Sequence, residues 1–449
     1  MTRHEKFRFR SLDELADRAA SLGVEIPLST DLTPLARPLR IGPCETPNRL
    51  AVHPMEGCDG TADGRPGELT IRRYERFARG GAGLLWYEAT AVVPEARANP
   101  RQLLLTADTA PAFERMLERA REVAGEARGH RPVAVLQLTH SGRYSRPVDR
   151  RAPIIAFHDP YLDPTTGVTP DQEPVTDDYL EALEERFAAA AALAYQVGFD
   201  GVDVKSCHRY LGSELLAGHT RPGRYGGSFE NRTRFLLDVV DRIRRRLPPE
   251  RFVAVRLNVY DGHPYPYGFG VDPDDVGRPD LLEPIRLARL LAERGVALVN
   301  VTAGNPYYSP HVNRPYDLPI HGGYVPPEHP LVGVARIVGL SRQVRRAVPG
   351  LAIVGTGFSW LRHFLGYAMA GAVGQGWCDL AGLGRGAFAH PDFARDLLET
   401  GRLDPKKVCA TCSRCTQIMR DGGMTGCVLR DRDVYLPIYQ AGRQTAGAR

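Results

Sequence analysis

The chain has 449 residues, of which 43% are hydrophobic and 25% are charged, and its formal net charge is +5. This length and composition are typical of a globular protein large enough for an α/β barrel with long loops. No apolar stretch approaches the ~18 residues of a membrane span, and the first residues lack the apolar centre of a signal peptide. The basic residues alternate with acidic ones, whereas nucleic-acid binding favours a clustered basic face. We therefore expect a cytoplasmic protein that binds neither membranes nor nucleic acids.

Short apolar segments rich in β-forming residues alternate with amphipathic helical segments along the chain. Residues 179–198 and 234–247 show the helical pattern most clearly, with apolar positions at helical spacing and charged residues between them. Alternation of this kind predicts a parallel sheet. Eight strands predict a (β/α)8 TIM barrel, and the expected strands are residues 49–55, 84–90, 133–140, 201–206, 252–258, 298–304, 352–357 and 377–385.

The predicted organisation has three parts. Residues 1–40 form an N-terminal extension, residues 41–403 form the barrel, and residues 404–449 form a short cysteine-rich appendage. Three connections are longer than a barrel loop requires and are rich in Pro, Gly, Tyr and His: 141–178, 259–280 and 303–330. They follow strands, so we expect them at the carboxyl end of the barrel, where barrel enzymes build their active sites.

Polar residues cluster at the ends of the predicted strands. They are the turn at 53–57, Gln137, His140, Arg143, Lys205, His208, Tyr210 and Arg256. The last two strands end in Gly-Thr-Gly (355–357) and Gly-Arg-Gly (384–386). Glycine turns after the seventh and eighth strands are typical of a phosphate site, because backbone N–H groups approach the oxygens closely there and Arg385 adds charge. Each turn alone could be ordinary turn chemistry.

One stretch carries a specific resemblance. FDGVDVKSCHRYLGSELLAGHTRPGRYGGSFENRTRFLLDVV (199–240) resembles the fourth strand and following segment of the Old Yellow Enzyme family of FMN-dependent oxidoreductases, above all in YGGSFENRTRF. Further similarity lies in NRLAVHPM, YERFARGGAGLLWYEAT, VLQLTHSGR, AVRLN and GLGRGAFAHPDF, in order over about residues 35–400. The resemblance implies a flavin-binding barrel with FMN as cofactor.

The resemblance also implies which residues hold the flavin. Pro54 and Met55 would lie against the ring, Ala89 would supply a backbone contact, and Gln137 and Arg256 would bind its pyrimidine end. A fixed positive charge at Arg256 would favour the anionic reduced flavin. The phosphate would lie against the two glycine turns, at Gly355, Gly357, Gly384 and Arg385. Taken alone, Met55 could fill the core and Arg256 could be a structural ion-pair partner.

By the same resemblance, the fourth strand is the substrate platform. Many relatives have a His-x-x-His or His-x-x-Asn pair that holds a substrate carbonyl, and a Tyr two positions later that donates a proton. The matching positions here are Lys205, His208 and Tyr210, so Lys205 departs from the pattern. A buried lysine could bind an oxyanion or carboxylate, or act as an acid if its pKa were lowered. The structural alternative is a lysine paired with a nearby carboxylate.

Four of the eight cysteines lie in one short segment, as Cys409-x2-Cys412-x2-Cys415 and then Cys427. A disulfide framework fits a cytoplasmic protein badly. Structural zinc usually uses two separated pairs of ligands, and three crowded cysteines with a distant fourth are closer to a [4Fe–4S] site. The segment is similar to the cluster site of the family's iron–sulfur branch, which includes trimethylamine dehydrogenase and 2,4-dienoyl-CoA reductase. The remaining cysteines, Cys44, Cys58, Cys207 and Cys378, are expected to be small buried residues.

These features together predict an FMN- and [4Fe–4S]-dependent oxidoreductase that transfers hydride between flavin and a small organic substrate, with reduction of an activated C=C as the preferred reaction. Oxidation of an amine or N-methyl group is the alternative, because Tyr260, Tyr265, Tyr267, Tyr307 and Tyr308 could surround a cation. A non-catalytic, zinc-stapled barrel is a remote third reading.

The electron donor or acceptor is the remaining partner. The chain has no Gly-x-Gly-x-x-Gly fingerprint after a predicted strand. We therefore expect either NAD(P)H docking over the flavin or a separate ferredoxin or flavoprotein that exchanges electrons through the cluster. We also expect a homo-oligomer.

Overall fold

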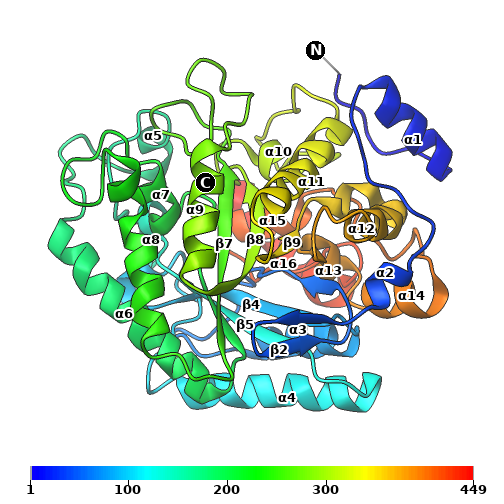
Figure 1. The fold of residues 1–449 in the computed structure, drawn as a ribbon, viewed down its shortest axis with the longest axis horizontal. Helices are drawn as coiled ribbons and strands as arrows, with labels where there is room; N and C mark the ends of the chain where they lie inside the picture. Colours follow the sequence, from blue (N-terminus) through cyan, green and yellow to red (C-terminus); the bar gives the residue numbers. More distant parts are fainter. Residues whose placement is uncertain (1–2, 448–449) are drawn as a thin grey trace.

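The computed structural model describes residues 3–447, and its centre is a closed barrel of eight parallel strands (Figure 1). Each strand pairs with its neighbour in chain order, and β10 closes the ring by pairing with β3. The predicted (β/α)8 barrel and all eight predicted strands are confirmed. The strands are β3 (Leu50–Val52), β4 (Leu84–Ala91), β5 (Val133–Thr139), β6 (Gly201–Val204), β7 (Phe252–Tyr260), β8 (Val296–Ala303), β9 (Ala352–Gly355) and β10 (Leu380–Leu383).

Helices surround the barrel because both faces of its strands must be covered. The two helices predicted most clearly are α6 and α8, and α8 begins earlier than expected because Ser228 caps it by accepting a hydrogen bond from Asn231 N. None of the described helices combines the length and apolarity that crossing a bilayer requires. The helices around the barrel are α3 (Glu68–Arg79), α4 (Ala110–Arg128), α6 (Asp177–Val197), α8 (Phe229–Arg244), α9 (Leu282–Glu293), α11 (Pro330–Ala347), α12 (Leu365–Gly374) and α14 (Phe393–Thr400).

The amino-terminal half of the barrel interior is filled by hydrophobic side chains. Buried side chains from successive strands, including Leu84, Trp86 and Phe252, form one cluster with Ile41. Ile41 belongs to an antiparallel hairpin of β1 (Leu39–Ile41) and β2 (Cys44–Thr46), which the sequence did not predict. Because this end is filled, a ligand site must lie at the carboxyl end of the strands.

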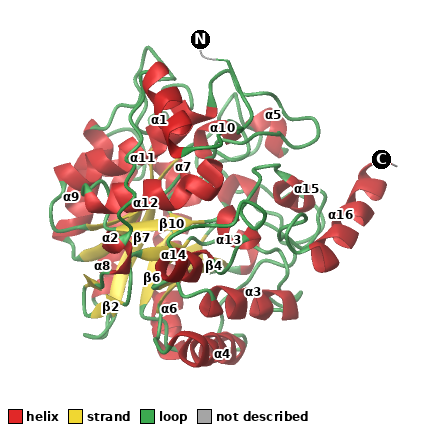
Figure 2. Ribbon diagram, turned by 90° about the vertical axis from the view of Figure 1, so that its right-hand side faces the viewer, coloured by secondary structure: helices red, strands yellow, loops and turns green. Residues whose placement is uncertain are grey.

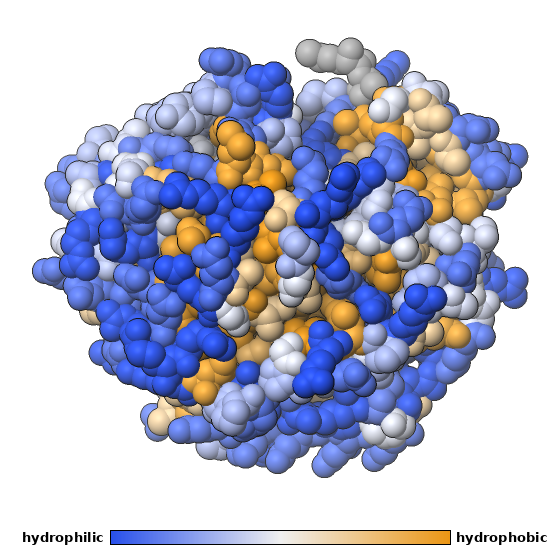
Figure 3. Space-filling view, in the orientation of Figure 1, coloured by the Kyte–Doolittle hydropathy of each residue, from blue (hydrophilic) through white to orange (hydrophobic). Residues whose placement is uncertain are grey.

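The N-terminal segment lies along the outside of the barrel. It contains α1 (Leu12–Ser21) and α2 (Thr33–Ala36), and α1 lies at the edge of the molecule in Figure 1. Phe7 packs edge-on against Trp360, with 5.4 Å between ring centroids. In the view of Figure 3, hydrophobic residues show on this side of the surface and also through its middle, with hydrophilic residues between and around them.

Short helices mark the loops at the carboxyl end of the barrel. Three of them, η2, α5 and α10, lie in the long connections that the sequence singled out. These loop helices are η1 (Pro94–Ala96), η2 (Gly142–Tyr144), α5 (Asp163–Thr166), α7 (Leu211–Leu216), α10 (Pro310–Asn313), η3 (Phe358–Phe364) and α13 (Arg385–Ala389).

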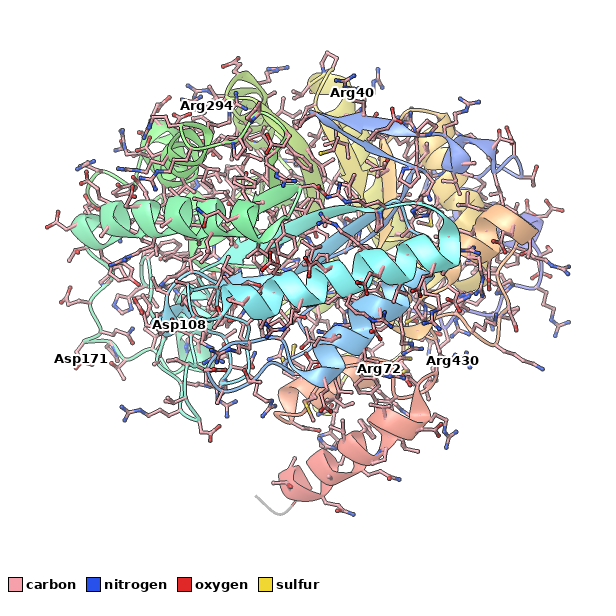
Figure 4. The ribbon with its side chains drawn as sticks, turned by 90° about the horizontal axis from the view of Figure 1, so that it is seen from below. Arg40, Arg72, Asp108, Asp171, Arg294 and Arg430 are labelled. Atoms are coloured by element: carbon pink, nitrogen blue, oxygen red, sulfur yellow. The ribbon has the colours of Figure 1, made fainter. Side chains whose placement is uncertain are left out.

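The cysteine-rich segment returns over the mouth of the barrel. It contains α15 (Arg414–Arg420) and α16 (Arg432–Gly447), which lie above α3 in Figure 2. Arg72 of α3 forms two hydrogen bonds with Asp431, and Figure 4 shows Arg72 close to this segment. Thr425 N donates to Gly57 O, so the segment is joined to the turn after β3. The three-part division stays a prediction, and its outermost residues, 1–2 and 448–449, lie outside the described residues.

Candidate active site

A cavity of about 150 Å³ lies at the carboxyl end of the barrel strands. Its wall brings together most of the residues predicted for cofactor and substrate, although they come from six different strands or the turns after them. The predicted residues in the wall are Pro54, Met55, Gln137, Lys205, His208, Tyr210, Arg256, Gly357, Gly384 and Arg385.

Arg256 is a buried charge without a carboxylate. Its side chain donates one hydrogen bond, from Nη1 to the carbonyl of Pro54 at 3.3 Å, and its Nε has no partner. No ion pair of this guanidinium occurs within residues 3–447, so the structural ion pair considered for it is not found. Burial lowers the pKa of Arg256. Its environment therefore has room for an acceptor or negative charge supplied by a ligand.

Asp203 on β6 holds the neighbouring groups in place. Its carboxylate accepts hydrogen bonds from Gln137 Nε2 at 2.6 Å, Trp86 Nε1 at 3.0 Å and the backbone N–H of Arg256 at 2.6 Å. Burial raises the pKa of Asp203 to about 6, although these donors favour the ionised form. Asp203 thereby fixes the Gln137 amide and the Arg256 backbone, without pairing with the guanidinium.

The glycine turns form another part of the wall. Gly357 has φ +107°, a conformation that favours glycine, and a Cβ on Gly384 would come within 2.7 Å of Met55 Sδ. Arg385 is half-buried and donates to Thr416 Oγ1 at 2.8 Å, and desolvation lowers its pKa. This end combines backbone that only glycine fits easily with a guanidinium, which suits a phosphate.

Two predicted residues do not line the cavity. Ala89 is buried, and its carbonyl accepts a hydrogen bond from Gln102 Nε2 at 3.1 Å. Gly355 lies at the end of β9, where a Cβ would come within 2.9 Å of Cys378 Sγ. In this structure Ala89 is tied to the Gln102 loop, and Gly355 allows β9 to pack closely.

Lys205 and Tyr210 meet at a carboxylate, Glu56. Lys205 Nζ and the Tyr210 hydroxyl each lie 3.2 Å from Glu56 Oε1. The ammonium also lies 3.5 Å from the centroid of the Tyr210 ring. The Tyr307 hydroxyl lies 3.4 Å from that of Tyr210. The carboxylate pairing considered for Lys205 is present, but Glu56 itself lines the cavity, so the pair belongs to the site.

His208 presents a neutral imidazole. Burial lowers its pKa well below the ordinary value, and Arg256 and Lys205 lower it further. Its Nε2 lies 3.0 Å from Asn313 Nδ2, which also donates to the carbonyl of Ala303. Nε2 therefore accepts from the Asn313 amide, and Nδ1 carries the ring proton.

Much of the remaining wall was missed from the sequence. Glu56 lies in the turn at 53–57 that the sequence singled out, directly after the predicted flavin contacts Pro54 and Met55, but no role was predicted for it. The C-terminal segment gave no such signal, yet it supplies part of the wall. The sequence had singled out the turns that contain His53, Glu56 and Thr356, and it had named Tyr307 for the amine alternative. The residues missed are Thr302, Pro306, Asn313, Arg314, Ser359, Gly382, Phe388, Thr416, Met419 and Thr425; Cys415, predicted as a metal ligand, also lines the cavity.

Beside the main cavity, Cys409, Cys412, Cys415 and Cys427 line one small cavity of about 20 Å³ together with Arg314 and Arg385. None of the eight cysteines forms a disulfide. Among residues 3–447, no group of three or more His, Cys, Asp or Glu side chains is arranged to hold a metal ion.

The cysteine loop, residues 409–415, has an uncommon backbone conformation beside a cysteine sulfur atom. Thr411 N donates to Cys409 Sγ at 3.4 Å, and Thr411 and Ser413 adopt positive φ values of 49° and 58°. Such conformations are uncommon for residues other than glycine and persist only where surrounding contacts impose them. Outside the loop, Cys58, Cys207 and Cys378 are buried as expected, whereas Cys44 is partly exposed.

Comparisons with known proteins agree with this architecture. The sequence profile of the NADH:flavin oxidoreductase / NADH oxidase family matches residues 34–268, just over half of the chain. An NADPH dehydrogenase of Geobacillus sp. (strain WCH70) is 31% identical over 276 residues, which cover 61% of this chain and 73% of the relative.

Two solved structures resemble more of the chain. A 2-naphthoyl-CoA reductase in complex with 2-naphthoyl-CoA has a TM-score of 0.70 and 18% identity, covering 92% of this chain and 58% of the other. Histamine dehydrogenase from Rhizobium sp. 4-9 has a TM-score of 0.66 and 21% identity, covering 89% of this chain and 52% of the other. The chain thus spans little more than half the length of these two proteins.

The profile match, the dehydrogenase relative and the barrel with its buried cationic cavity lead to one conclusion. The chain belongs to the NADH:flavin oxidoreductase / NADH oxidase family, and it is an FMN-dependent oxidoreductase of the Old Yellow Enzyme type.

Proposed function

We propose that this enzyme uses FMN and a [4Fe–4S] cluster to reduce an activated C=C bond in a small organic substrate. The observation that carries the proposal is the group of Lys205, Tyr210 and Glu56 in a cavity that also holds Arg256 and Arg385. The cavity thus combines cationic groups with a proton donor, which are the groups that such a reduction requires from the protein.

The cavity fits FMN in the chemistry of its donors. Pro54, Met55, Gln137 and Arg256 would hold the ring, and Gly357, Gly384 and Arg385 would hold the phosphate. The unpartnered Arg256 Nε supports this assignment, because a buried donor without an acceptor is costly unless a ligand supplies one. When bound, FMN supplies the hydride chemistry that side chains cannot.

The chain's own residues would bind the substrate carbonyl and deliver the proton. Burial, and next the Glu56 carboxylate, hold the pKa of Tyr210 well above its ordinary value, so its hydroxyl keeps its proton near pH 7. Lys205 supplies a fixed positive charge, and His208 supplies an N–H donor at Nδ1. Together they would polarise the carbonyl, while Tyr210 protonates the carbon that does not receive the hydride.

The four clustered cysteines are proposed to hold the [4Fe–4S] cluster. All four thiols line one cavity, and their spacing, with three cysteines within seven residues and a distant fourth, supports a multi-iron cluster over structural zinc. Arg314 and Arg385 line the same cavity and would offset the negative charge of the thiolates. Cys415 also lines the main cavity, which is proposed to hold FMN and is called the flavin cavity from here on. Electrons from NAD(P)H or from a redox partner protein could therefore pass between the two cofactors.

The reaction can be tested by anaerobic stopped-flow spectroscopy of the flavin absorbance. We expect NADH or NADPH, or reduced ferredoxin, to bleach the flavin, and 2-cyclohexenone or dimethyl fumarate to restore it. Tyr210→Phe should slow the restoring step by about 10²-fold, the ordinary contribution of a general acid. If neither compound restores the absorbance of the reduced enzyme, the proposed reaction is wrong.

The cluster is tested by metal and sulfide analysis of the anaerobically purified protein. The Cys412→Ser variant should contain less iron than the wild type and should lose the broad absorbance at about 400 nm that accompanies thiolate-bound clusters. Cys378→Ser is the matched control, because Cys378 is buried outside the segment. Stoichiometric zinc without iron or sulfide would contradict the cluster.

Amine oxidation remains the second candidate, because histamine dehydrogenase shares the fold. The geometry favours it less. Of the five loop tyrosines only Tyr307 lines the cavity, and Arg420 already lies 4.5 Å from its ring centroid. Lys205 similarly occupies the face of Tyr210. Bleaching of the oxidised flavin by histamine or trimethylamine would favour the amine reaction over the proposed one.

A further inference from the structure

A second cavity, of about 240 Å³, adjoins the flavin cavity. Glu56, Tyr307 and Met419 line both cavities, so the two are neighbours across these side chains. The second cavity lies between the loops after β4 and β5 and the C-terminal segment. None of the functions assigned above uses it.

Four arginines with little compensating charge surround the second cavity. We call Arg101, Arg146, Arg151 and Arg420 the arginine annex. Their hydrogen bonds go to backbone carbonyls: Arg101 to Cys58 and Gly422, Arg146 to Asp149, Arg151 to Thr165 and Arg420 to Pro306. The only ion pair of the annex in the described part of the chain joins Arg146 to Asp149 at 3.9 Å, and the Asp149 side chain is 98% exposed.

The other charged groups of this cavity are already paired. Arg143 forms ion pairs with Asp163 and Glu214, and Glu56 is bonded to Lys205. The annex is therefore a net positive surface. By contrast, Ser145 is 1% exposed, lines the same cavity, and its Oγ has no hydrogen-bond partner. A buried hydroxyl without a partner beside four cations indicates that an acceptor belongs there.

We propose that the arginine annex binds an anionic group, a phosphate or a carboxylate, on the substrate whose reacting part lies in the flavin cavity. The inference rests on the proposed function, because it assigns one substrate to both cavities. Guanidinium groups bind such oxyanions through paired, charge-assisted hydrogen bonds. The substrate class is thus an activated alkene with an anionic tail.

Two matched pairs of substrates test this class and distinguish its sources. Crotonyl-CoA and the crotonyl thioester of N-acetylcysteamine share the reacting group, but only the first carries phosphates. Monomethyl and dimethyl fumarate differ by one carboxylate. We expect kcat/KM to be at least about tenfold higher for the anionic member of one pair, and this preference to weaken with added salt because the annex is solvent-accessible.

The double variant Arg146→Gln/Arg151→Gln should abolish the preference. Its KM for the preferred anion should rise about tenfold with little change in kcat, because the lost contacts lie away from the reacting atoms. Gln retains an amide donor for the backbone carbonyls. Arg289→Gln is the matched control: Arg289 is also exposed and also bonded to a backbone carbonyl, that of Ala347, and it lies on α9 outside the cavity.

Direct binding separates failure of this inference from failure of the proposed function. Isothermal titration of the holoenzyme with pyrophosphate and with succinate should give binding that the double variant loses and the Arg289→Gln control keeps. If the neutral substrates are turned over and neither anionic substrate is preferred, anion binding by the arginine annex is wrong, and the proposed C=C reduction is still supported. If no alkene is reduced, the proposed function fails, and the absence of anion binding would then overturn the annex as well.

Discussion

Two buried arginines near the barrel mouth have opposite surroundings. Arg73 on α3 forms ion pairs with Asp59 and Glu88, and although burial opposes its charge, these carboxylates raise its pKa well above the ordinary value. Arg256 on β7 has only the Pro54 carbonyl, and burial lowers its pKa. Each is less than a tenth exposed. One charge is neutralised within the protein, and the other is left for a ligand.

The difference separates a charge that holds the fold from one that, in the proposed function, binds the cofactor. Glu88 also accepts a hydrogen bond from Gly57 N, so the Arg73 cluster fixes the turn that carries Pro54 and Met55. An uncompensated buried charge lowers stability. Arg256 is therefore expected to decrease the stability of the apoprotein and to increase its affinity for FMN.

The largest predicted effect comes from breaking the compensated cluster. Arg73→Met leaves Asp59 and Glu88 buried without a cation, so the free energy of unfolding should fall by about 3–5 kcal/mol. Urea unfolding of the apoprotein measures it. Arg119→Met, which removes an exposed arginine of α4 that pairs with Glu75, should leave the free energy of unfolding nearly unchanged. A loss below about 1 kcal/mol for Arg73→Met would show that the cluster is not the source of stability.

A smaller effect is predicted for Asp203, the carboxylate that binds the backbone of Arg256 but not its guanidinium. Its folded-state pKa of about 6 lies above the ordinary 3.8, so the folded protein binds the extra proton between these values. Its contribution to stability is therefore fully present below pH 3.8 and is lost as the pH rises through 6. At pH 8 this loss amounts to about 2–3 kcal/mol.

Asp203→Asn should remove this pH dependence while keeping an oxygen acceptor for Gln137 and Trp86. Urea unfolding at pH 5 and pH 8 checks it: the stability gained over the wild type should be larger at pH 8. Glu126→Gln is a suitable comparison, because Glu126 is an exposed carboxylate on α4 outside the cavity. If Asp203→Asn lowers stability more at pH 8 than at pH 5, the carboxylate is ionised and favourable there, and Arg256 is compensated after all.

The sequence predicted the barrel, and it drew attention to many residues that line the cavity, because both depend on local patterns; the roles of these residues stay predictions. Short apolar segments between helical ones identified all eight strands, motif similarity pointed to Gln137 and Arg256, and their place after the last two strands pointed to the Gly357 and Gly384 turns. The pairing of Glu56 with Lys205 joins positions 149 residues apart, and nothing local to either residue reveals it. Only the closed barrel brings them together.

The cysteine segment shows a second limit of sequence reasoning. Its cysteine spacing was recognisable, but nothing in that spacing shows that this apparent appendage covers the mouth of the barrel. Thr416 and Met419 line the flavin cavity, and Arg420 lines the annex. The hairpin that contains Ile41 was missed for a related reason: its strands are three residues long, too short for periodicity to register.

The smallest predicted effect concerns Arg256 itself. Arg256→Met removes a buried charge that has no carboxylate partner, so the apoprotein should be as stable as the wild type or more stable, in contrast to Arg73→Met. The cost should appear in the holoenzyme instead. The two-electron reduction potential of bound FMN should fall by about 30 mV, equivalent to about 1.4 kcal/mol, because a positive charge that favours the reduced cofactor is lost.

Dye-coupled anaerobic titration measures this potential. Arg256→Lys keeps the positive charge, so its FMN potential should stay close to that of the wild type. The paired measurement decides the comparison. If Arg256→Met destabilises the apoprotein by several kcal/mol and leaves the potential of bound FMN unchanged, then Arg256 serves the fold as Arg73 does. If stability is kept and the potential falls, the missing carboxylate around Arg256 is the feature that adapts this cavity to the flavin, because the charge is neutralised only when the cofactor is bound and reduced.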